Sequence, residues 1–297
     1  MPVILITGCS TGIGFATAEA LARNGNMVYA TMRTPANCPQ IRQLVDAEKL
    51  PIKILPLDVL DDQSVQNAVN KVISDEGVID VLINNAGVGS FGSVEELSIE
   101  MIRKDMETNY FGTVRCIKAV LPIMRERRSG SIINVTSVAG KVYSNFHGAY
   151  SASKAAVEAF SESLAQEMKP FNVKVAVVEP GIIETPIFRK VNAYPQKMLY
   201  PNLKRFMSLF AASLENHVTP SVVAEVIDDM VTGRTNSFRN PAGPDANPLL
   251  TWRGAASDED WINSVDIDDE TWISFMEQNM GLNVRKYMEQ SQMPQFN

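Results

Sequence analysis

Cysteine and histidine are scarce in this chain of 297 residues, which contains three of the first and two of the second. Cys9, Cys38 and Cys116 show no CxxC spacing and leave one thiol over under any pairing. A disulfide framework and a zinc site are therefore not expected. Structural disulfides belong to oxidising compartments, so their expected absence favours a cytoplasmic protein. Because no zinc site is expected, we also expect no metal centre.

Long apolar runs and runs of basic residues are also missing. No apolar stretch approaches the ~18 residues of a membrane span. The first apolar run, PVILITG, starts at residue 2, too early for the charged segment that opens a signal peptide. The formal net charge is -7, and the longest basic cluster, RERR at 125–128, is expected at a helix end. The composition therefore disfavours a nucleic-acid partner and a membrane span.

What the sequence does contain is an alternation of β-rich runs and helical patterns. Several runs are continuously apolar, as in parallel strands covered on both faces. The helical stretches 14–25 and 64–77 each end on a glycine, a common helix stop. The alternation predicts a single α/β domain of the Rossmann type, a doubly wound parallel sheet of about seven strands with helices on both faces. The expected strands are 3–7, 27–31, 52–58, 81–84, 131–137, 173–180 and one near 236–243.

Two regions extend beyond a minimal sheet. Residues 184–218 follow a strand end and are rich in Met, Leu and aromatic residues, so we expect them to form a substrate-binding segment. Residues 249–297 form a C-terminal extension in which acidic residues precede Trp261 and Trp272, which predicts the N-terminal turns of two short helices. We expect the extension to pack on the body or on a partner subunit; an oligomer arm or a partner-binding segment is the alternative.

The stretch TGCSTGIG, residues 7–14, lies between the first expected strand and the first expected helix. Gly8 allows a tight turn, Gly12 a close backbone approach and Gly14 the packing of the helix on the sheet. The helix N-terminus then offers N–H groups to a pyrophosphate. This position favours a dinucleotide site over a glycine-rich turn without a ligand, and Ser10 and Ile13 belong to the same site.

The end of the second strand discriminates between the two nicotinamide cofactors. An NAD site carries an acid there for the ribose hydroxyls, whereas an NADP site carries a cation for the additional phosphate. The residues present, Thr31 to Thr34, include no acid, and Arg33 is placed to bind a phosphate through two hydrogen bonds. A solvated surface arginine is the alternative. We therefore favour NADP(H) over NAD(H).

Two further strand ends carry candidate cofactor contacts. Asp58 and Val59 end the third strand, where the carboxylate can meet an adenine amino group. The motif NNAG ends the fourth strand and contributes Asn85, Ala86 and Gly87, whose missing side chain lets the backbone pass close to the ribose. The asparagines can instead serve only as turn residues.

The motifs TGCSTGIG, NNAG, NVTS, YSASK and PG follow one another in order. In this order and spacing the chain resembles the short-chain dehydrogenase/reductase family, in its short single-domain branch. The resemblance covers roughly residues 2–190 and extends more loosely to PAGPDA at 241–246. VYATMR and the long C-terminal part are similar to the hydroxysteroid and retinol dehydrogenase group within that family.

The resemblance implies a catalytic tetrad of Asn109, Ser137, Tyr150 and Lys154. It also implies that Asn109 bends its helix and holds a water that connects Lys154 to solvent, and that the protein is a homodimer or homotetramer. Taken singly, each residue has a structural alternative: a polar helix stripe for Tyr150 and Lys154, strand-end turn chemistry for Ser137, and a helix irregularity for Asn109.

The chemistry of Tyr150 and Lys154 can also be argued from the residues. They are four apart, so they share a helix face. A free tyrosine has a pKa of ~10, and a nearby ammonium and the positive nicotinamide ring of the oxidised cofactor both favour the phenolate. Tyr150 can then donate a proton to a carbonyl oxygen or accept one from an alcohol, while Lys154 also holds the nicotinamide ribose. Ser137, at a strand end, can bind the same substrate oxygen.

The loop PGIIETP follows the sixth strand and is expected beside the nicotinamide. Pro180 and Gly181 shape the loop, and the backbone of Ile183 and the hydroxyl of Thr185 are expected to bind the carboxamide. The resemblance implies hydride transfer on the pro-S face. His147 is interpreted as a pocket-lining or surface residue rather than a catalyst. The expected substrate wall consists of Ser137, Val142, Tyr143, Phe146 and Tyr150.

Together these patterns predict an NADP(H)-binding catalytic domain over residues 1–248. We expect an oxidoreductase, a carbonyl reductase or alcohol dehydrogenase, with Tyr150 as general acid/base. Its substrate would be an apolar ketone or secondary alcohol, steroid-like or retinoid-like, because residues 184–218 supply apolar and aromatic walls. A catalytically silent nucleotide-binding sensor or scaffold is one alternative, and an imine reductase, C=C reductase or epimerase is another. The intact tetrad and its four-residue spacing disfavour both.

Overall fold

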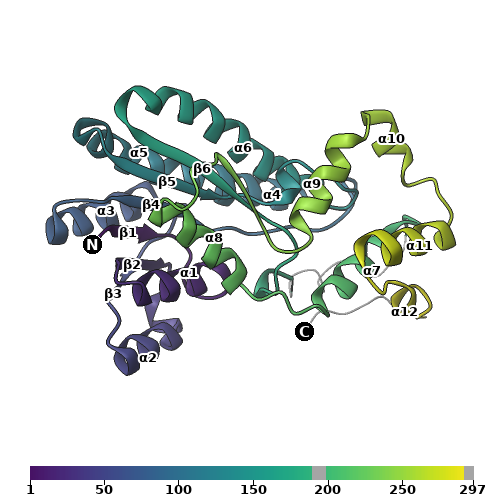
Figure 1. Ribbon diagram of the computed structural model, residues 1–297, viewed down its shortest axis with the longest axis horizontal. Helices are drawn as coiled ribbons and strands as arrows, with labels where there is room; N and C mark the ends of the chain where they lie inside the picture. Colours follow the sequence, from purple (N-terminus) through teal and green to yellow (C-terminus); the bar gives the residue numbers. More distant parts are fainter. Residues whose placement is uncertain (189–198, 291–297) are drawn as a thin grey trace.

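The computed structural model describes residues 1–188 and 199–290, so parts of the expected segments 184–218 and 249–297 lie outside the described residues. Within the described part, seven strands form one parallel sheet in the order β3-β2-β1-β4-β5-β6-β7 (Figure 1). This confirms the predicted fold class and every predicted strand to within a few residues. The strands are β1 (Val3–Ile6), β2 (Met27–Met32), β3 (Ile52–Pro56), β4 (Val81–Asn84), β5 (Gly130–Val135), β6 (Val173–Pro180) and β7 (Arg239–Ala242).

Helices cover both faces of the sheet (Figure 1). One face carries α1 (Gly12–Arg23), α2 (Pro39–Glu48) and α8 (Ser221–Thr232). The opposite face carries α3 (Asp62–Glu76), α5 (Gly112–Arg127) and α6 (Gly148–Met168). A further helix, α4 (Ile99–Asp105), runs through the π-helical turn η2 (Met106–Phe111) into α5. Short 3₁₀ turns occur at η1 (Pro35–Asn37), η3 (Val138–Gly140) and η4 (Lys169–Phe171).

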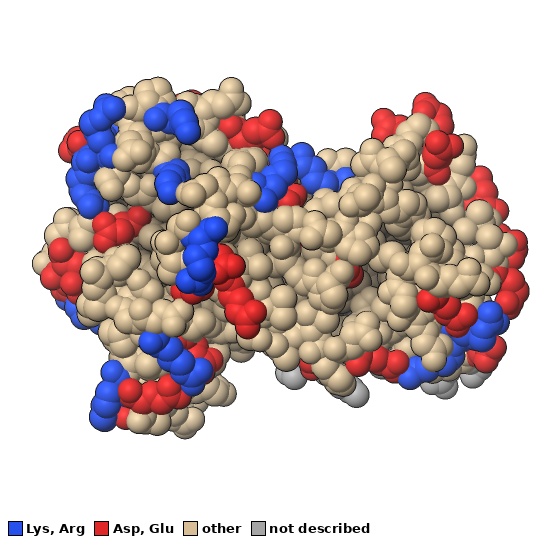
Figure 2. Space-filling model, in the orientation of Figure 1, with Lys and Arg blue, Asp and Glu red and all other residues tan. Residues whose placement is uncertain are grey.

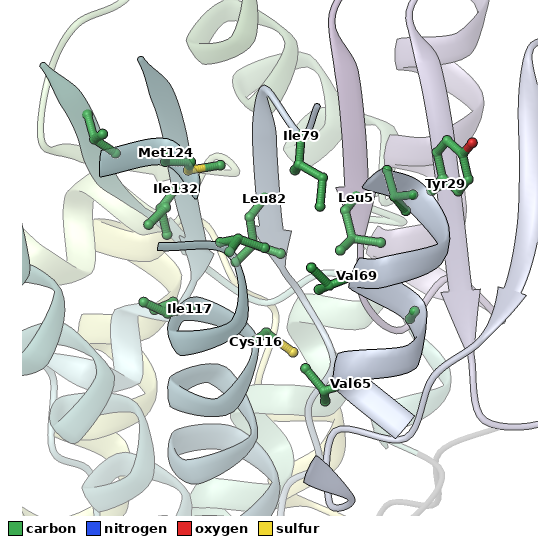
Figure 3. Close-up of a cluster of buried hydrophobic side chains, with 14 of the residues drawn as sticks. Leu5, Tyr29, Val65, Val69, Ile79, Leu82, Cys116, Ile117, Met124 and Ile132 are labelled. Atoms are coloured by element: carbon green, nitrogen blue, oxygen red, sulfur yellow. The ribbon is translucent and has the colours of Figure 1, made fainter. Parts of the chain in front are cut away.

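The two helical layers follow from the alternation of side chains along the buried strands. In β1, Leu5 points into the layer of α3 and α5, whereas Ile4 and Ile6 point into the layer of α1 and α8. Figure 3 shows the first layer, where Leu5 and Leu82 of the sheet lie near Val69 of α3. Both faces are apolar because both are covered, which explains the continuous apolar runs in the sequence.

Helix ends fall where the sequence predicts them. Gly25 and Gly77 follow α1 and α3 with φ angles of +83° and +75°, in the left-handed region that favours glycine. The basic cluster RERR ends α5, with Arg128 as its C-cap. In the ranges 1–188 and 199–290, none of the helices combines the length and the apolar character needed to cross a bilayer.

A second lobe, formed by α7 and the C-terminal helices, lies beside the carboxyl ends of the strands (Figure 1). Ser257 is the N-cap of α10 and Asp268 is the N-cap of α11, so both short helices begin where the acidic segments predict. Figure 2 shows acidic side chains along this end of the molecule. Trp272 and Met276 of α11 pack in one apolar cluster with Ala212 of α7. The lobe consists of α7 (Leu203–Leu214), α9 (Ala246–Ala255), α10 (Asp258–Asn263), α11 (Asp269–Met280) and α12 (Arg285–Met288).

Candidate active site

A cavity of about 520 Å³ lies at the carboxyl ends of the strands, where the order of the sheet reverses between β1 and β4. One part is lined by the glycine loop and the ends of β2, β3 and β4. The other part is lined by the segment before α6, by the chain after β6 and by α7. All but one of the predicted cofactor residues line this cavity: Gly8, Ser10, Gly12, Ile13, Arg33, Asp58, Val59, Asn85, Ala86, Gly87, Tyr150, Lys154, Pro180, Gly181, Ile183 and Thr185.

The exception is Gly14, which lies behind the wall and packs the loop together. A Cβ atom there would lie 2.4 Å from both the Gly8 carbonyl oxygen and the Asn85 amide nitrogen. Gly8 has a φ angle of +76°, and a Cβ on it would lie 2.8 Å from the Cα of Ala86. At Gly8 the loops after β1 and β4 therefore meet backbone to backbone, and at Gly14 the missing side chain leaves room for the Asn85 amide.

Thr7 joins the same two loops and was missed by the sequence analysis. Its hydroxyl oxygen accepts hydrogen bonds from the N–H groups of Asn85 and Ala86, both at 3.0 Å. The Asn85 amide donates to the carbonyl oxygens of Thr7 and Gly8 at 2.9 and 3.1 Å. In the sequence, Thr7 could have been found as the single polar residue at the end of an otherwise apolar strand.

The N-terminus of α1 has the properties of an anion site. Thr11, its N-cap, makes no side-chain cap hydrogen bond, and the first turn contains no acidic residue. Thr11, Gly12 and Ile13 all line the cavity. The first-turn N–H groups and the positive end of the helix dipole therefore fit a pyrophosphate group.

Arg33 and Asp58 extend this part of the cavity at the ends of β2 and β3. Arg33 is exposed and lines the cavity. Asp58 is half-buried, and its carboxylate accepts a hydrogen bond from the N–H of Leu60 at 3.0 Å. Arg33 thus adds a cationic side chain to this part of the cavity wall.

Ser137, Tyr150 and Lys154 all line the cavity. Ser137 follows β5 and begins η3, where its oxygen accepts from the N–H of Ala139 at 3.1 Å. The ammonium of Lys154 donates to the carbonyl of Val135 at 2.9 Å and lies 5.7 Å from the centre of the Tyr150 ring. The strand end and one face of α6 therefore place the three side chains together.

Asn109 lies beside this group rather than in the cavity wall. It occupies the π-helical turn η2, so the helix is irregular at the residue where the resemblance implies a bend. Its side-chain oxygen accepts from the N–H of Val88 at 2.9 Å, and its amide donates to the Val88 carbonyl at 2.9 Å and to Ser153 at 2.8 Å. A Cβ on Gly87 would lie 3.3 Å from Asn109 and 3.6 Å from the Lys154 ammonium, so the three residues converge.

Burial is the main cause of the pKa shifts of Tyr150 and Lys154 on α6. It raises the pKa of Tyr150 to about 12, against a smaller lowering by a hydrogen bond with Ser137, and the charge of Asp105 raises it further. Burial lowers the pKa of Lys154 to about 8, while the charges of Glu158 and Asp105 raise it. We expected the lysine to lower the pKa of Tyr150, but in the protein without cofactor the net shift of this pKa is upward. At neutral pH the phenol is protonated and the lysine is mostly a cation.

The loop after β6 is held by a carboxylate that the sequence analysis did not single out. Asp245 accepts a hydrogen bond from the N–H of Ile182 at 2.8 Å, and a Cβ on Gly181 would lie 2.1 Å from its other oxygen. The N–H groups of Gly181 and Glu184 bind carbonyl oxygens of Ala242 and Val218. Asp245 thus links this loop to the segment between β7 and α9.

The substrate wall differs in part from the prediction. Val142 lines the cavity with Ser137 and Tyr150, but Tyr143 and Phe146 do not. Tyr143 is 50% exposed, and its carbonyl accepts from the indole N–H of Trp261 at 2.9 Å. The side chain of Phe146 is buried in an apolar cluster behind the wall. The wall is instead made mostly by Phe91, His147, Phe188, Phe206, Leu209, Phe210 and Leu249.

Comparison with known proteins agrees with this geometry. A profile of the family described as short chain dehydrogenase matches residues 2–196, which include the glycine loop and all four residues of the predicted tetrad. The 3-ketodihydrosphingosine reductase of Bacteroides thetaiotaomicron is 39% identical over 247 residues, covering 82% of this chain and 88% of that protein. Retinol dehydrogenase 8 of Homo sapiens is 38% identical over 265 residues, covering 84% of this chain and 83% of that protein. Among solved structures, a variant of the actinorhodin polyketide ketoreductase with NADPH has a TM-score of 0.72 at 28% identity, covering 81% of this chain and 95% of that one.

Proposed function

Because the chain belongs to the short-chain dehydrogenase/reductase family of oxidoreductases, we propose that it is an NADP(H)-dependent carbonyl reductase or alcohol dehydrogenase. One observation carries the proposal. A single cavity joins an anion-binding helix terminus, the group Ser137, Tyr150 and Lys154, and a wall of apolar aromatic side chains. A nucleotide, a proton donor and an apolar substrate can therefore be held in contact.

The residues of this chain supply binding and proton transfer. A bound nicotinamide cofactor supplies or accepts the hydride. In reduction, the Tyr150 hydroxyl donates its proton to the carbonyl oxygen, and Ser137 hydrogen-bonds the same oxygen. The Lys154 cation stabilises the phenolate that remains until it is reprotonated, and it is placed to bind the nicotinamide ribose. In oxidation the same residues act in reverse, with the tyrosine accepting the alcohol proton.

The cofactor preference is proposed from the charge at the end of β2. Arg33 lies at the cavity edge where an NAD site would carry an acid, and it can bind a phosphate through two hydrogen bonds. The similar ketoreductase structure was determined with NADPH. For the carboxamide, the N–H groups of Gly181, Ile182 and Glu184 have partners, whereas among the described residues none accepts from the N–H of Ile183. This buried donor fits the expected role of Ile183.

The substrate is proposed to be an apolar ketone or secondary alcohol. Phe188, Phe206 and Phe210 line the same cavity as Tyr150, and they favour a substrate with a large apolar portion. One similar protein is named as a reductase of 3-ketodihydrosphingosine and another as a dehydrogenase of retinol, which agrees with a ketone or alcohol substrate. A steroid-like, retinoid-like or long-chain substrate would fit the proposal. We also propose that the protein is a homodimer or homotetramer, as the family implies, and that it is cytoplasmic, as its few cysteines suggest.

The test is a screen of NADPH and NADH oxidation over aliphatic, aromatic, steroid and retinoid carbonyl compounds. We expect turnover of apolar ketones with a clear preference for NADPH. Tight cofactor binding without oxidation of either cofactor across the whole panel would contradict the proposal and would favour a nucleotide-binding sensor or scaffold.

A further inference from the structure

The loop that follows β4 passes along the ring of the proposed proton donor. A Cβ atom on Gly89 would lie 3.3 Å from Cδ2 of Tyr150, so the backbone at this glycine lies against the phenol ring. Phe91, two residues further on, stacks on His147 at 4.9 Å between ring centroids, and His147 stacks on Tyr150 at 4.8 Å. The loop 88–91 therefore bounds the tyrosine both directly and through the stack.

Two side chains of the helix formed by α4 and η2 hold this loop. Asn109 accepts a hydrogen bond from the N–H of Val88 and donates one to its carbonyl, both at 2.9 Å. Asp105, four residues earlier on the same helix, accepts hydrogen bonds from the N–H and from the hydroxyl of Ser90, both at 3.0 Å. The two residues thus fix the loop on both sides of Gly89.

Asp105 brings a charge that this loop contact does not require. Its side chain is buried, with 1% of the residue exposed, and the burial of an ionised carboxylate is costly even when it is hydrogen-bonded. An asparagine could bind the N–H and the hydroxyl of Ser90 equally well, because its oxygen accepts and its amide can donate to a hydroxyl oxygen. Asn109 binds Val88 of the same loop in this neutral way. Holding the loop therefore does not explain why residue 105 is a carboxylate.

The charge of Asp105 acts on the two proposed catalytic side chains of α6, a helix that packs against α4. Burial raises the pKa of Tyr150, and Asp105 raises it further because a negative charge disfavours the phenolate. Burial lowers the pKa of Lys154, and the charges of Glu158 and Asp105 oppose this because they favour the ammonium. Burial also lowers the pKa of His147 to about 3, so the ring stacked on Tyr150 is neutral. The other ionisable side chains of the cavity wall are those of Arg33, Asp58 and Lys104.

We propose that Asp105 is a positioning residue of the reaction, whose carboxylate holds the loop 88–91 against the ring of Tyr150 and supplies a negative charge to the surroundings of Tyr150 and Lys154. The inference rests on the proposed function, in which Tyr150 donates a proton to a carbonyl oxygen and the Lys154 cation stabilises the phenolate. Because the charge favours the protonated form of both side chains, Asp105 extends ketone reduction to higher pH.

The first test measures kcat/KM against pH for the ketone that the wild type reduces fastest in the carbonyl screen. Asp105→Asn keeps hydrogen bonds to Ser90 and removes the charge. Tyr150 and Lys154 then lose their protons at a lower pH, so the high-pH limb should move down by about half a pH unit. Asp105→Ala removes the hydrogen bonds as well. It should move the limb by the same amount and also lower kcat by about tenfold, because the loop against Tyr150 is no longer held.

Two variants that keep the Asp105 carboxylate serve as controls. Ser90→Ala removes one hydrogen bond of the loop and should lower kcat by about fivefold, with the limb at its wild-type position. Glu107→Gln removes a negative charge two residues further along the helix, where the side chain is 43% exposed and paired with Arg115. It should change neither kcat nor the limb. A movement of the limb in Glu107→Gln equal to that in Asp105→Asn would reveal a general charge effect and would overturn the inference.

The second test needs no turnover. The dissociation constant of NADPH is measured by fluorescence against pH, and it should rise as Lys154, which is placed to bind the nicotinamide ribose, loses its proton. In Asp105→Asn this rise should occur about half a pH unit lower than in the wild type. NADPH affinity at about pH 6, where the lysine is a cation in both proteins, should stay close to the wild-type value and shows that the variant is folded.

The outcomes separate this inference from the function on which it rests. If the wild type reduces ketones, and either the limb or the pH of the NADPH transition stays in place in both neutral variants of Asp105, then the inference is wrong while the proposed function stands. If the wild type reduces none of the screened carbonyl compounds, both are overturned.

Discussion

Tyr150 shows what spacing can and cannot tell at the scale of one residue. The four-residue interval to Lys154 places the two side chains on one helix face, and the structure confirms that they lie together. The direction of the Tyr150 pKa shift could not be predicted, because it depends on how much apolar structure surrounds the phenol. A protonated tyrosine beside a lysine that is mostly cationic at neutral pH suits proton donation in the direction of reduction.

The charge state of Lys154 gives a prediction about pH. The charge of Glu158, one helical turn further along α6, raises the pKa of the lysine against the lowering by burial. In Glu158→Gln that pKa should fall further below about 8, so the lysine loses its proton at a lower pH. The high-pH limb of the kcat/KM profile for ketone reduction should therefore move down by about one pH unit.

A matched control for this experiment is Glu162→Gln. Glu162 pairs with the same arginine as Glu158, Arg239, but from an exposed position. The Glu162→Gln substitution should leave the high-pH limb of the kcat/KM profile at its wild-type position. A limb that stays in place or moves up in Glu158→Gln would show that Lys154 is not the group that titrates.

Arg33 gives a prediction about the cofactor. Arg33→Asp replaces the cation at the end of β2 by the acid that an NAD site carries. The ratio of kcat/KM for NADPH over NADH should fall by about 100-fold, because a charge-assisted contact to the phosphate is lost. Lys104→Gln, which removes another cation of the cavity wall, should leave the ratio unchanged. If Arg33→Asp keeps the preference for NADPH over NADH, then Arg33 does not bind the cofactor phosphate.

At the scale of elements, the strands and the glycine-terminated helices were predictable, because they follow from local apolar patterns and from left-handed caps. Contacts between elements distant in sequence were not. Asp245, which holds the N–H of Ile182, is 63 residues away from it. The sequence places a proline and a glycine before this aspartate but does not say which loop it meets.

The ion cluster between α6, β6 and β7 gives a prediction about stability. Arg239 contacts Glu158 and Glu179, whose side chains are both 1% exposed. Arg239→Met would leave two buried carboxylates unpaired and should lower the free energy of unfolding by about 3–5 kcal/mol near neutral pH. Urea unfolding measures this loss, and Arg23→Met, at an exposed ion pair, should cost much less.

The loss in Arg239→Met should depend on pH. Burial and the Glu158 charge already raise the pKa of Glu179, and Arg239 lowers it, so the variant should raise it further. A carboxyl group with a raised pKa stabilises the fold at acidic pH and loses this contribution as pH rises through the folded-state value. The deficit should therefore be larger at about pH 8 than at about pH 5. An equal deficit at both pH values would contradict this assignment.

At the scale of the whole molecule, the cavity is completed by parts of the chain that come last in the sequence. Leu209 and Phe210 of α7 and Leu249 of α9 line it, and α11 packs behind α7 through Trp272. The apolar character of residues 184–218 predicted such a wall in outline. The sequence did not predict that Phe91 and His147 line the cavity while Tyr143 is half exposed. Which of these side chains faces the cavity depends on how the two lobes meet.

The central claim, that Tyr150 is the proton donor of a nicotinamide-dependent carbonyl reductase, is tested most directly by Tyr150→Phe. The substitution removes one hydroxyl and keeps the ring that stacks on His147. We expect NADPH affinity to remain within about twofold of the wild type and ketone-dependent NADPH oxidation to fall by about 10²–10⁴-fold. Turnover close to the wild-type rate in a variant that binds NADPH normally would contradict the account.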